Sequence, residues 1–209
     1  MCSHHTLSQI FSGVQFLDSW QEPEHLLATK GRNLVSSLRD LLSWRGSLTQ
    51  RLEQHCGAKV TLRLINQHRV TCWPSEPDFW NNPLPLESDF PLLIRNAWLM
   101  VDDTPLVFAH SQIVLHNIPE AEYRSIREGS QPLGYLFMAN KGQLARTHLQ
   151  LNVLSLDNLA RFSDSWKSGP CWCRRSFFLV NDVLLARILE IFPPTWPPRI
   201  KSNEVKFLD

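Results

Sequence analysis

Hydrophobic residues recur at helical spacing in the first third of the chain. An apolar stripe with intervals of four, three and one residues follows Asn33: Leu34, Leu38, Leu41 and Leu42. Such a stripe is typical of an amphipathic helix. Gly46 interrupts it, and Ser47 with Gln50 has the spacing of a capping box, which predicts the start of a second short helix. Together these signals predict a helical hairpin over residues 33–56.

Strand patterns dominate the rest of the chain. Alternating or continuous apolar runs predict strands at six places: residues 59–65, 92–101, 106–115, 143–153, 172–180 and 183–192. Turn-forming residues at positions 102–105, and the pair Asn181 and Asp182, predict two hairpins. Residues 133–137 are expected to lead into further extended chain.

Weaker signals complete the outline. Capping residues predict a short helix over residues 117–127, and residues 157–163 are expected to form another. Five prolines between positions 73 and 91 predict a long irregular connection, because proline cannot donate to a strand ladder. Strands dominate without alternating regularly with helices. The pattern therefore indicates an α+β fold on a single antiparallel sheet.

Two of the apolar strands each carry one charged residue. Strand alternation places Arg95 on a face with Leu93 and Ala97, and Glu190 on a face with Ile188. If both faces line one space, the chain builds an apolar chamber that holds an arginine and a carboxylate, which suits a small anionic molecule. The alternative is a structural ion pair, or exposure of one residue at a strand end. Periodicity alone leaves both open.

Composition and charge narrow the class of protein. The 21 basic and 20 acidic residues leave a formal net charge of +1, which gives no basic surface for nucleic acid or membranes. The five cysteines and eight histidines lack the spacing of metal ligands, so we expect no metal and reduced thiols. We see no signal peptide and no membrane-spanning segment, and we expect a cytoplasmic protein.

The order of several segments resembles the bacterial chorismate–pyruvate lyases. Five stretches carry the resemblance at compatible spacing: residues 47–54, 93–95, 132–137, 172–176 and 189–193. No one of them is specific, but their collinear order is hard to obtain by chance. The resemblance implies an antiparallel sheet whose ligand lies in an internal cavity under two helical flaps, here residues 33–56 and 117–130.

The resemblance also implies domain limits and site residues. Residues 33–198 would form the lyase-like domain, between an N-terminal extension over residues 1–32 and a tail over residues 199–209. The family's substrate-binding positions map onto four residues of this chain: Leu48, Arg95, Leu133 and Glu190. At the two leucines the backbone is the expected contact.

The implied activity is cofactor-free conversion of chorismate to 4-hydroxybenzoate and pyruvate, the first committed step of ubiquinone synthesis. Arg95 would anchor the ring carboxylate, and Glu190 would contact the hydroxyl end and assist proton movement. Arg174 and Arg175 would either help to receive the second carboxylate or form an ordinary basic pair. The protein is expected to be a monomer whose partners are this substrate and product.

Departures from the family pattern keep other functions open. Leu48 stands where members usually carry methionine, and the arginine usual between the equivalents of Gly134 and Tyr135 is missing. One alternative is a non-catalytic, effector-sensing domain of the same fold that binds a small carboxylate. Another is a divergent lyase that acts on a different carboxylate.

Overall fold

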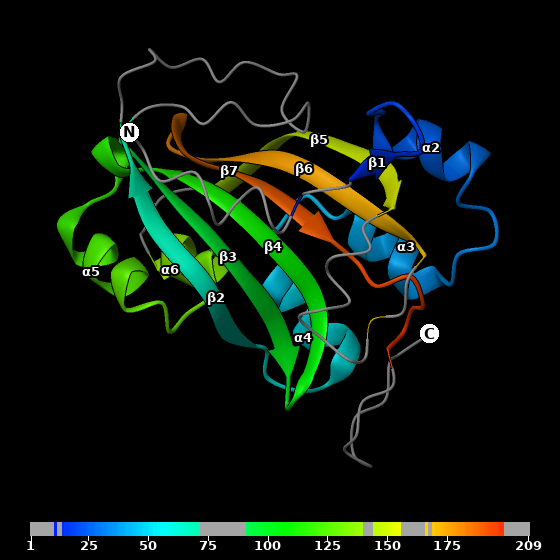
Figure 1. The fold of residues 1–209 in the computed structure, drawn as a ribbon, viewed down its shortest axis with the longest axis horizontal. Coiled ribbons are helices and arrows are strands. Elements are labelled where there is room, and N and C mark those ends of the chain that lie inside the picture. Colours follow the sequence, from blue (N-terminus) through cyan, green and yellow to red (C-terminus); the bar gives the residue numbers. More distant parts are fainter. Residues whose placement is uncertain are drawn as a thin grey trace.

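The computed structural model describes residues 11, 14–71, 91–139, 144–155, 166 and 169–198. Seven strands form one sheet in the order β1-β5-β6-β7-β4-β3-β2, and all neighbours are antiparallel (Figure 1). The predicted fold class is therefore confirmed. The predicted helix over residues 157–163 and the tail after residue 198 lie outside the described residues, as does the proline-rich connection except Pro91.

The strands are β1 (Gln15–Phe16), β2 (Thr61–Val70), β3 (Leu92–Val101), β4 (Thr104–Val114), β5 (Leu144–Ser155), β6 (Pro170–Val180) and β7 (Val183–Ile191). Both predicted hairpins, β3–β4 and β6–β7, are confirmed. Asn181 and Asp182 have φ angles of 50° and 61° between β6 and β7. A two-residue hairpin turn favours this left-handed conformation because it matches the twist of the strands.

The helices are α2 (Pro23–Thr29), α3 (Ser36–Ser43), α4 (Leu48–Cys56), α5 (Glu120–Glu128) and α6 (Leu133–Ala139), with a 3-10 turn η2 (Leu115–Asn117). The predicted helical hairpin is present, and Ser47 caps α4 by accepting from the Gln50 amide. Two starts were predicted too early: α3 begins at Ser36, and α5 begins at Glu120.

Residues 133–137 were expected to lead into further extended chain, and their own helical structure was not predicted: they form most of α6. Leu133, Leu136 and Phe137 are spaced three and four residues apart and all pack into one buried cluster under the sheet. The stripe fits a helix, but it is too short for its period to be distinguished from a strand.

Two helix pairs cover one face of the sheet. The α3–α4 cover (residues 36–56) packs its leucines against residues of β3, β4 and β5. The α5–α6 cover (residues 120–139) packs against other residues of β3 and β4 and against β6 and β7. Figure 1 shows α3, α4 and α6 on the same side of the strands. The helices predicted as flaps thus form one layer over the sheet. None of the helices in the described part of the chain has the length and apolar character to cross a bilayer.

Part of the predicted N-terminal extension packs on this domain. Gln15 and Phe16 pair with β5, and Gln21 forms a further bridge to that strand. Leu26 of α2 is fully buried in the same hydrophobic cluster as α3 and α4. The predicted boundary at residue 33 therefore falls between two helices that contact each other.

Replacing Leu26 by alanine tests this packing. Deleting a fully buried leucine side chain costs about 2–5 kcal/mol, since a cavity remains. Leu17→Ala is the control, because Leu17 is 46% exposed and should change stability by less than about 0.5 kcal/mol. Urea unfolding measures both. Equal small effects would show that α2 does not stabilise the domain.

The two covers touch at Gly134. A Cβ added there would lie 2.6 Å from the Ser47 hydroxyl that caps α4. A side chain at position 134 would therefore push the capping group away. The absence of a side chain lets the first turns of α4 and α6 approach each other.

A double-mutant cycle measures this contact. Gly134→Ala should cost about 1 kcal/mol more in the native background than in a Ser47→Gly background, because only the native cap hydroxyl must be displaced. Comparing the two backgrounds cancels the helix propensity of alanine itself. Chemical unfolding of the four proteins gives the coupling, and a coupling near zero would mean that the covers do not meet there.

Candidate active site

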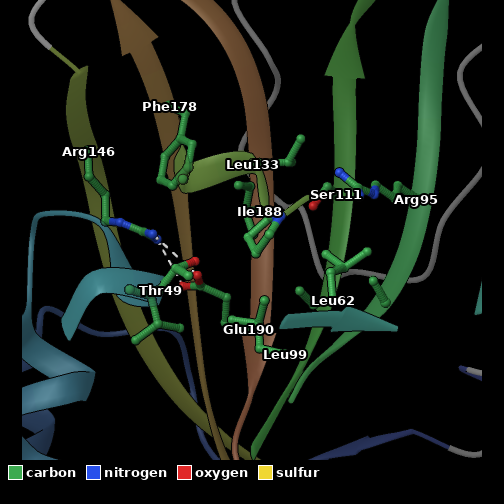
Figure 2. A pocket seen from close by; sticks show the side chains of 15 residues that line it. Thr49, Leu62, Arg95, Leu99, Ser111, Leu133, Arg146, Phe178, Ile188 and Glu190 are labelled. Carbon is green, nitrogen blue, oxygen red and sulfur yellow. Dashed lines mark hydrogen bonds and ion pairs between the residues drawn. The ribbon is translucent and has the colours of Figure 1, made fainter. Parts of the chain in front are cut away.

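A cavity lies between the central strands and the first turns of α4 and α6 (Figure 2). The empty space there is about 420 Å³, which includes part of its open mouth. Its lining is mainly apolar, with polar groups from Thr49, Arg95, Ser111, Arg146 and Glu190. The four predicted binding residues, Leu48, Arg95, Leu133 and Glu190, all line this one cavity.

Arg95 is a buried cation with unused hydrogen-bonding capacity. Its side chain is 1% exposed, and Nη2 donates to the carbonyl of Gln131 at 2.8 Å. Nε and Nη1 have no partner among the described residues. Burial lowers the pKa of Arg95 to about 10, so it keeps its charge at neutral pH. A buried charge of this kind is costly until an anion compensates it.

Glu190 occupies the other side of the cavity, two strands away on β7. Arg146 donates to both of its oxygens, at 2.9 and 3.2 Å, and Arg174 Nε donates to Oε2 at 2.5 Å. Burial acts to raise the pKa of Glu190, but the charges and hydrogen bonds of the two arginines outweigh it and hold the pKa below its ordinary value. Glu190 is therefore an ionised acceptor at neutral pH.

Glu190 does form structural ion pairs, but not with Arg95, the partner that the ion-pair alternative considered. Glu190 pairs with Arg146 and Arg174, and neither ion pair involves Arg95. Figure 2 shows Arg95 and Arg146 on opposite sides of the cavity, with Glu190 joined to Arg146. The space between Arg95 and Glu190 thus remains available for a ligand.

Arg146 is a charged residue of the cavity lining that the sequence did not predict. Besides Glu190 it contacts the Ser176 hydroxyl at 2.6 Å, and its guanidinium lies 4.3 Å from the centre of the Phe178 ring. Burial lowers its pKa to about 10, against the opposing effect of Glu190, so it too stays charged. The pairing of β5 with β6 is irregular between Thr147 and Gln150, which breaks the alternation that would have placed Arg146.

Arg174 and Arg175 have separate environments. Arg174 is fully buried and holds Glu190, but it does not line the cavity. Arg175 lies on the other side of β6, where it donates to the Gln150 side chain and stacks on Trp20. Of the arginines on β5 and β6, Arg146 is the one that the cavity exposes to a ligand.

Charge is unbalanced around this cavity. Three buried guanidinium groups, on Arg95, Arg146 and Arg174, face one buried carboxylate, on Glu190. The described residues thus leave an excess of two positive charges. Within the same ranges no three histidine, cysteine or acidic side chains gather as metal ligands would. The arrangement favours an organic anion.

The Glu190 ion pairs should appear in the pH dependence of stability. Glu190→Gln leaves two buried arginines without a counter-ion and should cost about 3 kcal/mol at pH 7. A carboxyl whose folded pKa is depressed contributes fully above its ordinary pKa of 4.5 and loses that contribution as pH falls through the lower folded value. The difference in unfolding free energy between native protein and variant should therefore shrink below pH 4.5. Denaturation at several pH values measures it, and a difference that does not change with pH would contradict an ionised Glu190.

Some known proteins are similar to this chain in sequence, and others share its fold. The family model for chorismate lyase matches residues 18–198. A "Probable chorismate pyruvate-lyase" of Nitrosospira multiformis is 30% identical over 165 residues, 73% of this chain and 88% of the relative. Another of that name from Methylococcus capsulatus is 32% identical over 162 residues, 71% of this chain and 96% of the relative.

Solved structures with the same fold include the effector domain of PhnF from Mycobacterium smegmatis. It has a TM-score of 0.56 at 14% identity and covers 71% of this chain and 88% of its own. The gene product SA0254 of Staphylococcus aureus has a TM-score of 0.51 at 14% identity, over 70% of this chain and 87% of its own. Identities this low show the fold alone. The sequence relatives are more specific and confirm the predicted lyase family: the chain belongs to the chorismate lyase family.

Proposed function

We propose that this protein converts chorismate to 4-hydroxybenzoate and pyruvate. The observation that carries the proposal is the cavity in which Arg95, with two unpartnered nitrogens, faces an ionised Glu190. Chorismate has a ring carboxylate at one end and a hydroxyl at the other. A fixed cation and a fixed hydrogen-bond acceptor match these two ends.

Arg95 is the anchor for the ring carboxylate. Its planar fork offers parallel N–H groups that fit a carboxylate, and Nε and Nη1 are the atoms left without a partner. Leu48 and Leu133 are the first residues of α4 and α6, where backbone N–H groups lack a partner within the helix. Their backbones therefore support the same anion while their side chains provide apolar lining.

Glu190 acts at the hydroxyl end of the ring. The reaction breaks the ether bond at ring carbon 3, removes the proton from carbon 4 and leaves the ring aromatic. The departing enolpyruvate takes up a proton at its methylene carbon and becomes pyruvate, so no oxidant or reductant is needed. An ionised Glu190, held by two arginines, accepts a hydrogen bond from the hydroxyl and assists the loss of the neighbouring proton.

The second carboxylate of chorismate accounts for the excess positive charge. Arg146 lines the cavity and retains donor capacity on Nη2, which makes one contact to Glu190. It is therefore better placed for the enolpyruvyl carboxylate than Arg174 or Arg175. The cavity walls also hold the substrate in a reactive conformer. We further propose that the protein works as a cytoplasmic monomer and supplies ubiquinone synthesis.

Turnover of chorismate tests the proposal. Purified protein incubated with chorismate should form 4-hydroxybenzoate and pyruvate in equal amounts, well above the spontaneous background. Glu190→Gln should remove most of the rate, by about a hundredfold or more, because the proton acceptor is lost. Arg95→Gln should weaken 4-hydroxybenzoate binding about a hundredfold, as expected for loss of a buried charge-assisted pair. Chromatography and calorimetry measure the two effects.

The alternatives give different results in the same assays. Tight 4-hydroxybenzoate binding without turnover would favour an effector-sensing domain, and binding of other carboxylates alone would favour a divergent lyase. Leu62→Val is the control, because Leu62 lines the cavity with an apolar side chain and should alter both constants only slightly. Native rates in both charged variants would reject the site.

A further inference from the structure

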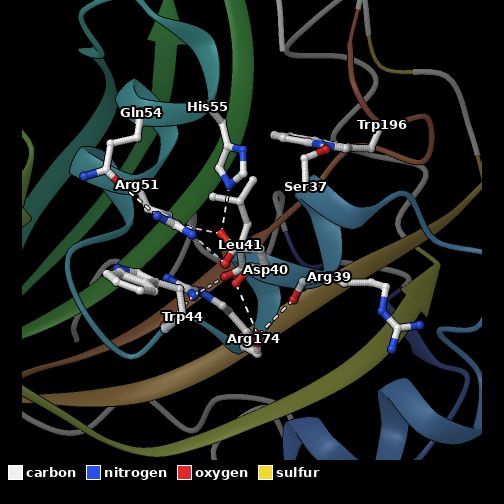
Figure 3. Close-up of polar contacts among 11 residues, drawn as sticks. Ser37, Arg39, Asp40, Leu41, Trp44, Arg51, Gln54, His55, Arg174 and Trp196 are labelled. Carbon is white, nitrogen blue, oxygen red and sulfur yellow. Dashed lines mark hydrogen bonds and ion pairs between the residues drawn. The ribbon is translucent and has the colours of Figure 1, made fainter. Parts of the chain in front are cut away.

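Arg174 connects the cavity carboxylate to the α3–α4 cover. Its Nε donates to Glu190, while Nη1 donates to the carbonyls of Leu41 and Trp44, the latter at 2.9 Å. Figure 3 shows Arg174 beside Leu41 and Trp44 at the end of α3. Leu41 lies in the last turn of that helix and Trp44 is its C-cap. One buried side chain thus connects Glu190, which lines the cavity, to the α3–α4 cover.

The position of Arg174 satisfies two sets of negative groups. The last carbonyls of a helix have no partner within it, and they form the negative end of the helix dipole. α3 has no basic residue of its own in its last turn. Arg174 supplies that charge from the sheet, and Glu190 compensates it from the other side. The ionised state of Glu190 therefore keeps a buried cation in place beneath the cover.

A second arginine reinforces the connection. Arg146, which also binds Glu190, donates from Nε to the carbonyl of Gly46 at 3.3 Å. Residues 41–46 end α3 and lead into α4, and Leu48 and Thr49 immediately beyond them line the cavity. The segment that positions the cavity wall is thus attached to the sheet through the two arginines that hold Glu190.

Side-chain contacts also join α3 to α4, so an attachment at the end of α3 bears on both helices. Asp40 of α3 accepts from Arg51 of α4 at 2.6 and 2.8 Å and contacts His55 at 2.8 Å (Figure 3). The hydrogen bond from Arg51 is the main reason that the pKa of Asp40 lies below its ordinary value. Because α3 and α4 are tied to each other, release at residues 41–46 would free both helices together.

We propose that Arg174 is a positioning residue that couples Glu190 to closure of the α3–α4 cover. While Glu190 is ionised and oriented, Arg174 holds the end of α3 against the sheet and the cavity stays enclosed. Loss of this link loosens the cover and speeds the exit of a bound ligand. The coupling exists in the ligand-free protein, and only the identity of the ligand rests on the proposed function.

Hydrogen exchange by mass spectrometry tests the coupling on the whole chain. Arg174→Lys keeps the charge, but its single nitrogen cannot occupy both of the positions from which Nε bonds Glu190 and Nη1 bonds the two carbonyls. Amides in residues 41–56 should exchange about tenfold faster, as the loss of one charge-assisted hydrogen bond allows. Arg175→Lys is the matched control, because it changes the neighbouring arginine on the other side of β6. Residues 120–128 of the other cover serve as an internal reference.

Glu190→Gln provides a second route to the same result. It should loosen the same residues 41–56 from a distant position in the sequence, and its effect should not add to that of Arg174→Lys. General destabilisation, which Glu190→Gln also causes, speeds exchange in both covers, so the proposed link predicts a clearly larger increase in residues 41–56 than in residues 120–128. Unchanged exchange in residues 41–56, or equal change in both covers, overturns the proposal. If Arg174→Lys does not fold, the Glu190→Gln comparison decides in the same way.

Ligand release gives an independent measurement. Stopped-flow tryptophan fluorescence measures the release of 4-hydroxybenzoate. The ligand should leave Arg174→Lys about tenfold faster than it leaves Arg175→Lys, because Arg174→Lys loses one charge-assisted hydrogen bond that holds the cover. Equal release rates would contradict a role of Arg174 in closure. If the native protein does not bind 4-hydroxybenzoate, the proposed function fails. The exchange experiment on the ligand-free protein still decides the coupling.

Discussion

The buried ion pairs of Glu190 with Arg146 and Arg174 are the interaction on which the rest of the structure depends. The Glu190 carboxylate joins β7 to β5 and β6, and through Arg174 it reaches the end of α3. Burial alone would neutralise this group, but two guanidinium charges keep it ionised. Removing either side would leave uncompensated charge in the interior, so the three residues are required together.

The positive charge that remains unbalanced bears on function more than on stability. A buried ion pair is weak evidence for stability, because well-packed apolar residues often serve as well. Arg95 is harder to explain structurally, since two of its nitrogens have no partner among the described residues. A site that keeps such a cation ready for an anion forgoes stability and gains preorganised binding.

The sequence predicted much of this site because the strands that carry it are regular. Alternation in β3 and β7 puts Arg95 and Glu190 on the cavity face, and the family resemblance brought Leu48 and Leu133 to them. Arg146 was not predicted because the alternation of inward and outward side chains along β5 is interrupted. His148, with a φ of 51°, lies where the pairing of β5 with β6 is irregular. The partners of Glu190 depend on strand order, which local patterns do not contain.

The charged groups proposed to bind a ligand also contact the two helical covers of the cavity. Arg95, the proposed anchor, donates to Gln131 in the connection between α5 and α6, as Arg174 donates to the end of α3. Each cover is therefore held by an arginine that also serves, directly or through Glu190, the place where a ligand would sit. A ligand that engages these charges must change how firmly the covers are held. The excess positive charge suits a dianion better than a monoanion. A reaction that releases one carboxylate from the cavity would therefore also alter the charge balance by which, in our proposal, the covers are held.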